Sequence, residues 1–126
     1  MAKISNFKTG YAEKKEFTFD GAKITLKRAD AEFHQGLMDI LRAYDEKLDK
    51  KEEKRRDDDV AAHYSTLIVG WDNLIYKDNK VPFSKKNAEI LALSGVRFQN
   101  WLTRNINNVE GFATEEQLKF EFDLKN

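Results

Sequence analysis

The sequence predicts a mainly α-helical domain of the α+β class, in which an N-terminal β-hairpin packs on a bundle of about four to five helices. Two patterns indicate this class. Apolar residues alternate with polar ones on both sides of Asp20-Gly21, and farther along the chain they recur at spacings of three and four. The 126 residues are enough for one domain, which we assign to residues 15–126, after a flexible arm of residues 1–14.

The hairpin is predicted over residues 15–27, because Asp-Gly is favoured in two-residue turns whose central positions need positive φ. A turn at Asp20-Gly21 places Phe17 opposite Ile24, and the apolar side chains of both strands then share one face. A hairpin alone is marginally stable in water. Its apolar face must therefore pack on the segment that follows.

A first amphipathic helix is predicted behind Asp30, a residue suited to an N-cap, because apolar residues from Phe33 to Leu48 recur at helical spacing. It leads into the stretch from Asp45 to Asp59, in which fourteen of fifteen residues are charged. We expect the helix to extend into solvent there. A second helix is then expected to begin at Asp57-Asp58-Asp59, because acidic residues suit a helix N-terminus.

The second helix is predicted to end at Trp71, because the helical spacing continues from Val60 to that residue and Gly70 lies near its end. A loop over residues 72–82 follows, with a turn-like sequence at residues 77–80.

Two further helices complete the predicted bundle. Pro82, the only proline, disfavours helix at the residue before it, and Ser84 can cap a third helix. Ser94-Gly95 interrupts that helix, and a fourth one follows and closes at Gly111.

The C-terminal segment carries two signals. Thr114 and Gln117 form a capping-box pattern for a helix, whereas the residues after them alternate strictly between apolar and charged, as in a strand. We interpret it as a helix followed by an extended stretch, which either closes the edge of the core or is recognised by another chain. The candidate partner-binding residues are Leu118, Phe120, Phe122 and Leu124.

Composition and charge argue against several classes of protein. The chain has 22 basic and 22 acidic residues, and a zero net charge argues against a nucleic-acid-binding domain, which is normally strongly basic. The absence of cysteine excludes a disulfide scaffold and a thiolate zinc site. No apolar segment approaches the roughly 20 residues of a membrane span, and the N-terminus does not resemble a signal peptide. We therefore expect a soluble, cytoplasmic protein that does not bind membranes.

The sequence contains no recognisable catalytic or metal-binding motif, so we expect no enzyme activity, no metal and no cofactor. His34 and His63 belong to no zinc-ligand pattern, and we interpret both as structural or surface residues. Asp57-Asp58-Asp59 lacks the spacing of a calcium-binding loop, which favours a helix cap or a solvated cluster. The basic residues of 50–56 alternate with acidic ones, which favours a solvated helix surface over a nucleic-acid site.

One part of the sequence resembles a known family. The segment Leu67–Leu74, together with Tyr76–Ala88, is similar to the tail assembly chaperones of long-tailed bacteriophages. In that family a helix ends in a tryptophan followed by an acidic residue, and a polar turn precedes a Val-Pro-Phe-Ser/Thr segment that opens a helix with an early asparagine. The matching residues are Trp71, Asp72, Val81, Pro82, Phe83, Ser84 and Asn87.

Two positions depart from the family pattern. Asp78-Asn79 stands where relatives often have Asp-Gly, and Lys85-Lys86 follows the cap where Pro-Glu is common. Structural roles can still be assigned from the residue types. We interpret Trp71 as the anchor of the loop after it, and Phe83 as a hydrophobic staple preceding the cap.

The resemblance implies a non-enzymatic assembly factor in the cytoplasm of the host cell. Such chaperones bind the long, largely helical tape measure protein, keep it soluble, help tail tube subunits to gather around it, and are absent from the mature virion. The expected partners are thus the tape measure protein and the tail tube protein, and self-association is left open. In many phages a frameshift yields a longer product, of which this chain would be the shorter form.

Two other functions are open from the sequence. A head-tail connector or tail completion protein would also be small and poor in motifs. A nucleic-acid-binding regulator would use the basic residues between Lys50 and Arg56.

Overall fold

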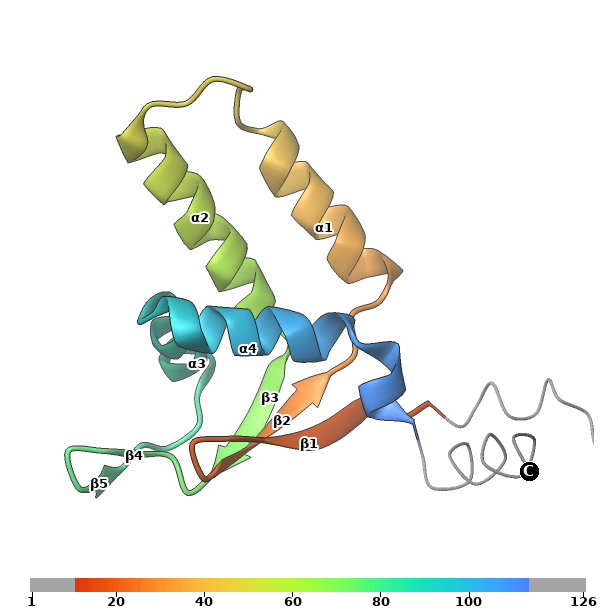
Figure 1. Cartoon of the computed structure of the whole chain (residues 1–126), viewed down its shortest axis with the longest axis vertical. Helices are drawn as coiled ribbons and strands as arrows, with labels where there is room; N and C mark the ends of the chain where they lie inside the picture. The colour runs from red at the N-terminus through yellow and green to blue at the C-terminus, as the bar shows by residue number, and fades with distance from the viewer. Residues whose placement is uncertain (1–10, 114–126) are drawn as a thin grey trace, which may run out of the picture.

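The computed structural model describes residues 11–113. It is an α+β structure with an antiparallel sheet near the N-terminus, as the sequence predicts (Figure 1). Its elements are, in chain order, β1 (Lys14–Phe19), β2 (Ala22–Lys27), α1 (Ala31–Arg42), α2 (Lys50–Ser65), β3 (Ile68–Asp72), β4 (Ile75–Tyr76), β5 (Asn79–Lys80), α3 (Lys85–Leu93), α4 (Val96–Asn107) and the 3-10 helix η2 (Val109–Phe112).

Strands β1 and β2 form the predicted hairpin in the predicted register. Phe17 lies opposite Ile24, and the two turn residues Asp20 and Gly21 have φ angles of 48° and 81°. Both values lie in the left-handed region that an Asp-Gly turn accommodates. The apolar face of β2 is the buried one, because Ile24 and Leu26 are fully inaccessible to solvent.

The predicted helix from residue 57 to Trp71 is wrong at its C-terminal end, because α2 ends at Ser65 and residues 68–72 form strand β3. This strand pairs antiparallel with β2, with Ile68 opposite Leu26, and gives the sheet order β1-β2-β3. The β-branched pair Ile68-Val69 suits a pleated strand as well as a helix. The unpaired edge of β2 therefore decides the conformation of this segment.

The prediction for the charged stretch is also wrong in its boundaries. Helix α1 is capped by Asp30, as expected, but it ends at Arg42, and α2 begins at Lys50. The side chain of Asp49 caps α2 by accepting a hydrogen bond from the backbone N–H of Glu52 at 2.8 Å. The residues 57–59, predicted to start the helix, lie within it instead. An aspartate cap with acidic residues in the first turn explains the earlier start.

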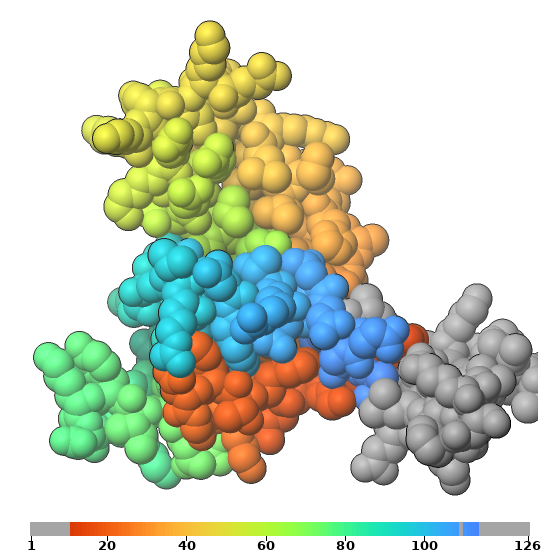
Figure 2. All heavy atoms as spheres, viewed as in Figure 1, coloured from red at the N-terminus to blue at the C-terminus, as the bar shows by residue number. Residues whose placement is uncertain are grey.

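Helices α1 and α2 stand out from the rest of the molecule as an antiparallel pair, which we call the α1–α2 arm (residues 30–65) (Figures 1 and 2). Over the described residues, the helices of the predicted bundle are arranged as an arm and a body. In the body, α4 lies across the sheet, and α3 lies beside the base of α2 (Figure 1).

The core lies between α4 and the apolar face of the sheet. Trp101 of α4 donates an indole N–H to the carbonyl oxygen of Thr18 at 3.1 Å, and Phe98 packs edge-on against Phe19 with ring centroids 5.1 Å apart. The largest fully buried side chains are Phe112, Ile24, Leu26, Leu102 and Ile106. These contacts fix the helix on the hairpin by burial of apolar surface.

The two ends of the described chain lie side by side. The backbone N–H of Ala12 donates to the carbonyl oxygen of Phe112 at 2.7 Å, and Tyr11 pairs with Ala113. The predicted flexible arm of residues 1–14 thus includes residues that are paired here, while its first ten residues lie outside the described part. Helix α4 ends at Asn107, four residues before the predicted Gly111, and η2 follows it.

Candidate functional site: the tryptophan unit and the exposed apolar surface

Trp71 lies near the end of β3 and anchors the far end of the loop that follows. Its indole N–H donates a hydrogen bond to the carbonyl oxygen of Val81 at 2.8 Å. The ring of Phe83 packs edge-on against the indole, with centroids 5.0 Å apart and planes at 85°. This is the perpendicular geometry that aromatic pairs favour. The anchoring role predicted for Trp71 is confirmed.

The start of α3 is tied to the same place. Ser84 caps the helix, as predicted, by accepting a hydrogen bond from the backbone N–H of Asn87 at 3.0 Å. The side-chain amide of Asn87 in turn donates to the carbonyl oxygen of Pro82 at 3.0 Å. The consecutive carbonyl groups of Val81 and Pro82 are therefore bound by two different side chains.

Asp72 closes the first turn of the intervening loop. Its carboxylate accepts a hydrogen bond from the backbone N–H of Asn73 at 2.9 Å, and Asn73 has a positive φ of 61°. Asparagine tolerates this conformation better than most residues. We call Trp71, Asp72, Val81, Pro82, Phe83, Ser84 and Asn87 the tryptophan unit, because the structure brings all of them to the base of one hairpin.

The hairpin that the tryptophan unit supports is formed by β4 and β5. Its two central turn residues are Lys77 and Asp78, with φ angles of 49° and 64°. The turn predicted over residues 77–80 is therefore centred on 77–78. Ile75 and Tyr76 are 59% and 66% exposed, so this hairpin presents large side chains to solvent.

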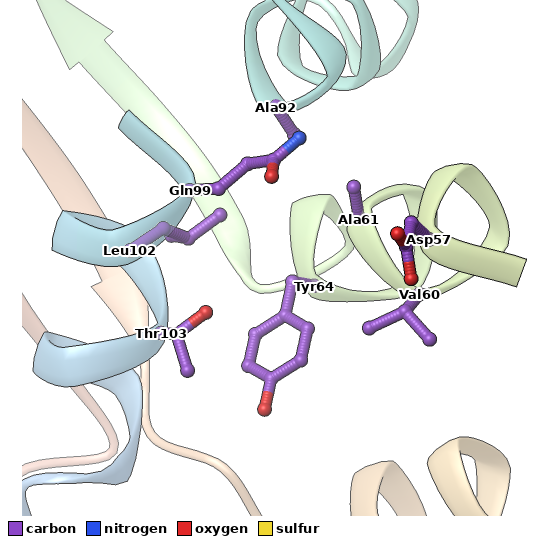
Figure 3. A pocket seen from close by; sticks show the side chains of 8 residues that line it. All are labelled: Asp57, Val60, Ala61, Tyr64, Ala92, Gln99, Leu102 and Thr103. Carbon is purple, nitrogen blue, oxygen red and sulfur yellow. The ribbon is translucent and has the colours of Figure 1, made fainter. Parts of the chain in front are cut away.

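A second feature is a groove between α2 and α4, next to the end of α3 (Figure 3). Figure 3 shows side chains of α4 on one side of this α2–α4 groove, facing those of α2 on the other. Its volume of about 170 Å³ is below the roughly 300 Å³ at which small-molecule pockets begin. The groove is lined by Asp57, Val60, Ala61, Tyr64, Ala92, Gln99, Leu102 and Thr103.

The chemistry of this groove suits an apolar side chain. Val60, Ala61 and Leu102 provide apolar walls, whereas Asp57 and Gln99 place polar atoms in the lining (Figure 3). An amphipathic helix of another protein offers such a side chain with polar residues around it.

Pairs of exposed apolar residues also occur on α1 and α3. Met38 and Leu41 of α1 are 45% and 41% exposed, and we call them the α1 stripe. Ile90 and Leu93 of α3 are 54% and 39% exposed, and we call them the α3 stripe. In each pair the residues are three positions apart, so they share one face of their helix.

Sequence reasoning missed the α2–α4 groove, because its walls come from helices that are far apart in the chain. The α3 stripe had a local signal. Within the predicted third helix, Ala88 and Ala92 form the buried face of α3, which leaves Ile90 and Leu93 exposed. A spacing of four between two small residues marks a face suited to close helix packing.

The two histidines have different surroundings. The ring of His63 stacks on Phe33 with centroids 4.5 Å apart, and its Nε2 lies 2.8 Å from the carbonyl oxygen of Phe33. A carbonyl only accepts hydrogen bonds, so Nε2 is the protonated nitrogen in this contact. His34 is exposed on α1. Within residues 11–113 no group of three or more histidine and carboxylate side chains is arranged to hold a metal ion.

The basic residues of 50–56 lie in the first half of α2, where acidic partners are close. Lys54 pairs with Asp58 at 3.2 Å, and Arg56 pairs with Asp57 at 3.3 Å. These contacts reduce the positive field that would attract phosphate groups. Among the described helices, none has the length and apolar character needed to cross a membrane.

The candidate partner-binding residues Leu118, Phe120, Phe122 and Leu124 lie outside the described residues. No family model matches the chain, and no curated protein or solved structure matches it.

Proposed function

We propose that this protein is a tail assembly chaperone of a long-tailed bacteriophage, a non-enzymatic factor of the host cytoplasm. It binds the tape measure protein, keeps it soluble, promotes assembly of the tail tube, and is left out of the mature virion. The tail tube protein is the second proposed partner.

The observation that carries this proposal is the tryptophan unit. The seven residues on which the family resemblance rests all lie within residues 71–87, and they meet at the base of the β4–β5 hairpin. Trp71 and Asn87 bind successive carbonyl groups there. Because the members of the motif stabilise one local structure, they support a fold shared with the tail assembly chaperones. The step from shared fold to shared function is an analogy.

The α2–α4 groove supports the choice of partner. Its volume of about 170 Å³ suits one large apolar side chain, and its lining is mixed apolar and polar. A largely helical partner presents such side chains at regular intervals along one face. Successive copies of the chaperone can therefore cover successive stretches of a long helix, one anchor side chain in each groove.

The charged arm supports the solubilising role. Residues 45–59 contain fourteen charged side chains, and the outer end of the α1–α2 arm carries them into solvent (Figures 1 and 2). A dense mixture of charges keeps a protein surface hydrated and resists aggregation. A chaperone bound to an apolar partner needs such a surface on the side that faces away from the partner.

The test is co-expression of this chain with the proposed partner, the tape measure protein, scored by soluble co-purification. We expect the partner to be insoluble alone and soluble in the complex. A Val60→Glu variant should reduce the yield of complex, because it places a charge in the groove. Thr18→Glu is the matched control, since Thr18 is exposed on the outer face of the sheet and should leave the yield unchanged.

The C-terminal residues are tested in the same assay by replacing Phe120 and Phe122 with serine. If this variant loses the complex and Val60→Glu does not, the contact is assigned to the C-terminal segment and not to the groove. If wild-type chain forms no complex, and mature particles contain it in fixed amount, the protein is a structural tail component. DNA binding that falls steeply with salt would instead indicate a regulator.

A further inference from the structure

The turn of the β1–β2 hairpin is tied to the start of α4. The guanidinium group of Arg97, in the first turn of α4, donates hydrogen bonds to both carboxylate oxygens of Asp20, at 2.6 Å and 2.7 Å. The same guanidinium group lies over the ring of Phe19, 5.2 Å from the ring centroid. Paired hydrogen bonds of this kind fix the orientation of both side chains. The carboxylate of Asp20 is therefore held against the helix.

Asp20 and Gly21 form a dipeptide with a reactivity of its own. The backbone nitrogen of Gly21 can attack Cγ of Asp20, and glycine has no side chain that would hinder this approach. A C–N bond forms, the protonated carboxyl group and the amide N–H release one water molecule, and a five-membered succinimide ring results. Water then opens the ring at either carbonyl group. The product is aspartate again or isoaspartate, in which the backbone continues through Cγ, and the mass of the chain is unchanged.

The folded structure opposes this reaction at two points. Ring closure requires the side chain of Asp20 to rotate until Cγ faces the backbone nitrogen of Gly21 in the geometry of attack. While Arg97 binds both carboxylate oxygens, that side chain is not free to rotate. The backbone is constrained as well, because the turn holds φ angles of 48° and 81° and places Phe19 opposite Ala22. Closure of the ring therefore requires the contact with α4 to open first.

We propose that Asp20-Gly21 is a latent isomerisation site and that Arg97 suppresses the reaction there. The salt bridge lies on the surface, with both side chains exposed, so it adds little to the stability of the whole fold. Its effect is local, because it restrains one carboxylate. Neither residue lines the α2–α4 groove or belongs to the tryptophan unit, so this proposal does not depend on the proposed function.

Isoaspartate at position 20 would damage the support of α4. It adds one carbon to the backbone of a two-residue turn, which displaces Phe19 from its place opposite Ala22. The ring of Phe19 packs edge-on against Phe98 of α4, with centroids 5.1 Å apart. Arg97 thus protects the strand end on which its own helix rests.

The test is ageing of the full chain at neutral pH, with isoaspartate counted by enzymatic methylation and located at position 20 by mass spectrometry. Arg97→Gln removes the charge and the paired hydrogen bonds, whereas Arg97→Lys keeps the charge. Because an exposed salt bridge is weak, we expect isomerisation to be roughly two- to fivefold faster in Arg97→Gln than in wild type. Arg97→Lys should show a smaller increase, and wild type unfolded in urea should be the fastest. Equal rates in wild type and Arg97→Gln would overturn the proposal.

Two controls separate local protection from a general loss of stability. Arg104→Gln removes another exposed arginine of α4 and should leave the rate unchanged. Ile106→Val removes one methyl group from a buried side chain, which lowers stability without touching the turn, and it should also isomerise like wild type. If either control accelerates isomerisation as much as Arg97→Gln does, general loosening explains the effect and Arg97 has no protective role.

The fold should tolerate Arg97→Gln because both side chains of the salt bridge are exposed, and circular dichroism checks this directly. Should that variant not fold, Arg97→Lys takes its place in the comparison. A rate in Arg97→Lys equal to that of wild type would then count against the paired hydrogen bonds as the source of protection.

Discussion

Gly36 of α1 lies directly against the imidazole ring of His63 of α2. A methyl group at position 36 would come within 2.6 Å of Cε1 of His63, well inside normal contact. The imidazole ring has little freedom to move, because it stacks on the ring of Phe33 and is hydrogen-bonded to the carbonyl oxygen of Phe33. The close approach of the two helices of the arm therefore depends on a residue without a side chain.

Gly36→Ala should destabilise the protein although alanine is the better helix former. Alanine gains up to about 1 kcal/mol in a helix interior, whereas overpacking costs about 1–3 kcal/mol. We expect a net loss of roughly 1 kcal/mol in urea unfolding. In a His63→Ala background the same change should be neutral or stabilising, and equal effects in both backgrounds would contradict the steric explanation.

Trp71→Phe should lower the free energy of unfolding by about 1 kcal/mol, because it removes one hydrogen bond to the carbonyl oxygen of Val81 and keeps an aromatic ring against Phe83. Amide hydrogen exchange should quicken in the β4–β5 hairpin and at the start of α3. Unchanged exchange there would mean that the tryptophan unit does not support the hairpin.

The N-cap of α1 should make the stability of the folded state depend on pH in the acid range. The backbone N–H of Phe33 donates to the carboxylate of Asp30 at 2.8 Å, which lowers the pKa of Asp30 below its usual 3.8. A lowered pKa stabilises the folded state above pH 3.8, and this contribution is lost as the pH falls through the folded-state pKa. An asparagine at position 30 would cap the helix nearly as well as aspartate does, but its side chain does not titrate.

The stability difference between wild type and Asp30→Asn should therefore be constant well above pH 3.8 and should shrink as the pH falls below that value. Urea unfolding of both proteins at each pH measures it, and the other carboxyl groups cancel in the comparison. A difference that stays constant with pH would show that the charge of Asp30 is not involved.

A hydrogen bond in the outer part of the arm should make the stability of the folded state depend on pH in the alkaline range. The hydroxyl of Tyr44 donates a hydrogen bond to the carboxylate of Asp59, and this raises the pKa of Tyr44 above its usual 10.0. A raised pKa stabilises the folded state below pH 10.0, and the contribution is lost as the pH rises through the folded-state pKa. Wild type should be more stable than Tyr44→Phe near neutral pH.

That advantage of wild type over Tyr44→Phe should disappear above pH 10.0. Thermal unfolding of both proteins across this range gives the comparison, and ultraviolet absorbance follows the ionisation of the tyrosines. An advantage that persists in alkali would assign it to packing of the ring instead of the hydrogen bond.

Local signals in the sequence predicted local structure correctly. The Asp20-Gly21 turn and the alternation around it gave the register of β1 and β2, and Asp30 and Ser84 cap the helices that they were expected to cap. In each case the deciding interaction lies within a few residues of the signal. The same holds for the hydrogen bonds of the tryptophan unit at the start of α3.

Interactions between distant residues explain what could not be predicted. The segment from Ile68 to Trp71 fits either a helix or a strand, and pairing with β2, more than 40 residues earlier, decides between them. Two aspartate sites, Asp49 and Asp57, both suit a helix start, and only one of them is used. The α2–α4 groove depends on how three helices pack, which no local pattern records.

The insertion of the arm between neighbouring strands has a consequence for the order of folding. The backbone N–H of Lys27 donates to the carbonyl oxygen of Leu67 at 2.7 Å, so the chain leaves the sheet and returns to the same place. Closing a flexible loop of that length costs entropy. A helical pair that forms early brings its two ends together and shortens the effective loop. We therefore expect the helical pair of the arm to speed the pairing of β3 with β2, because it keeps the two ends of the long connection close together.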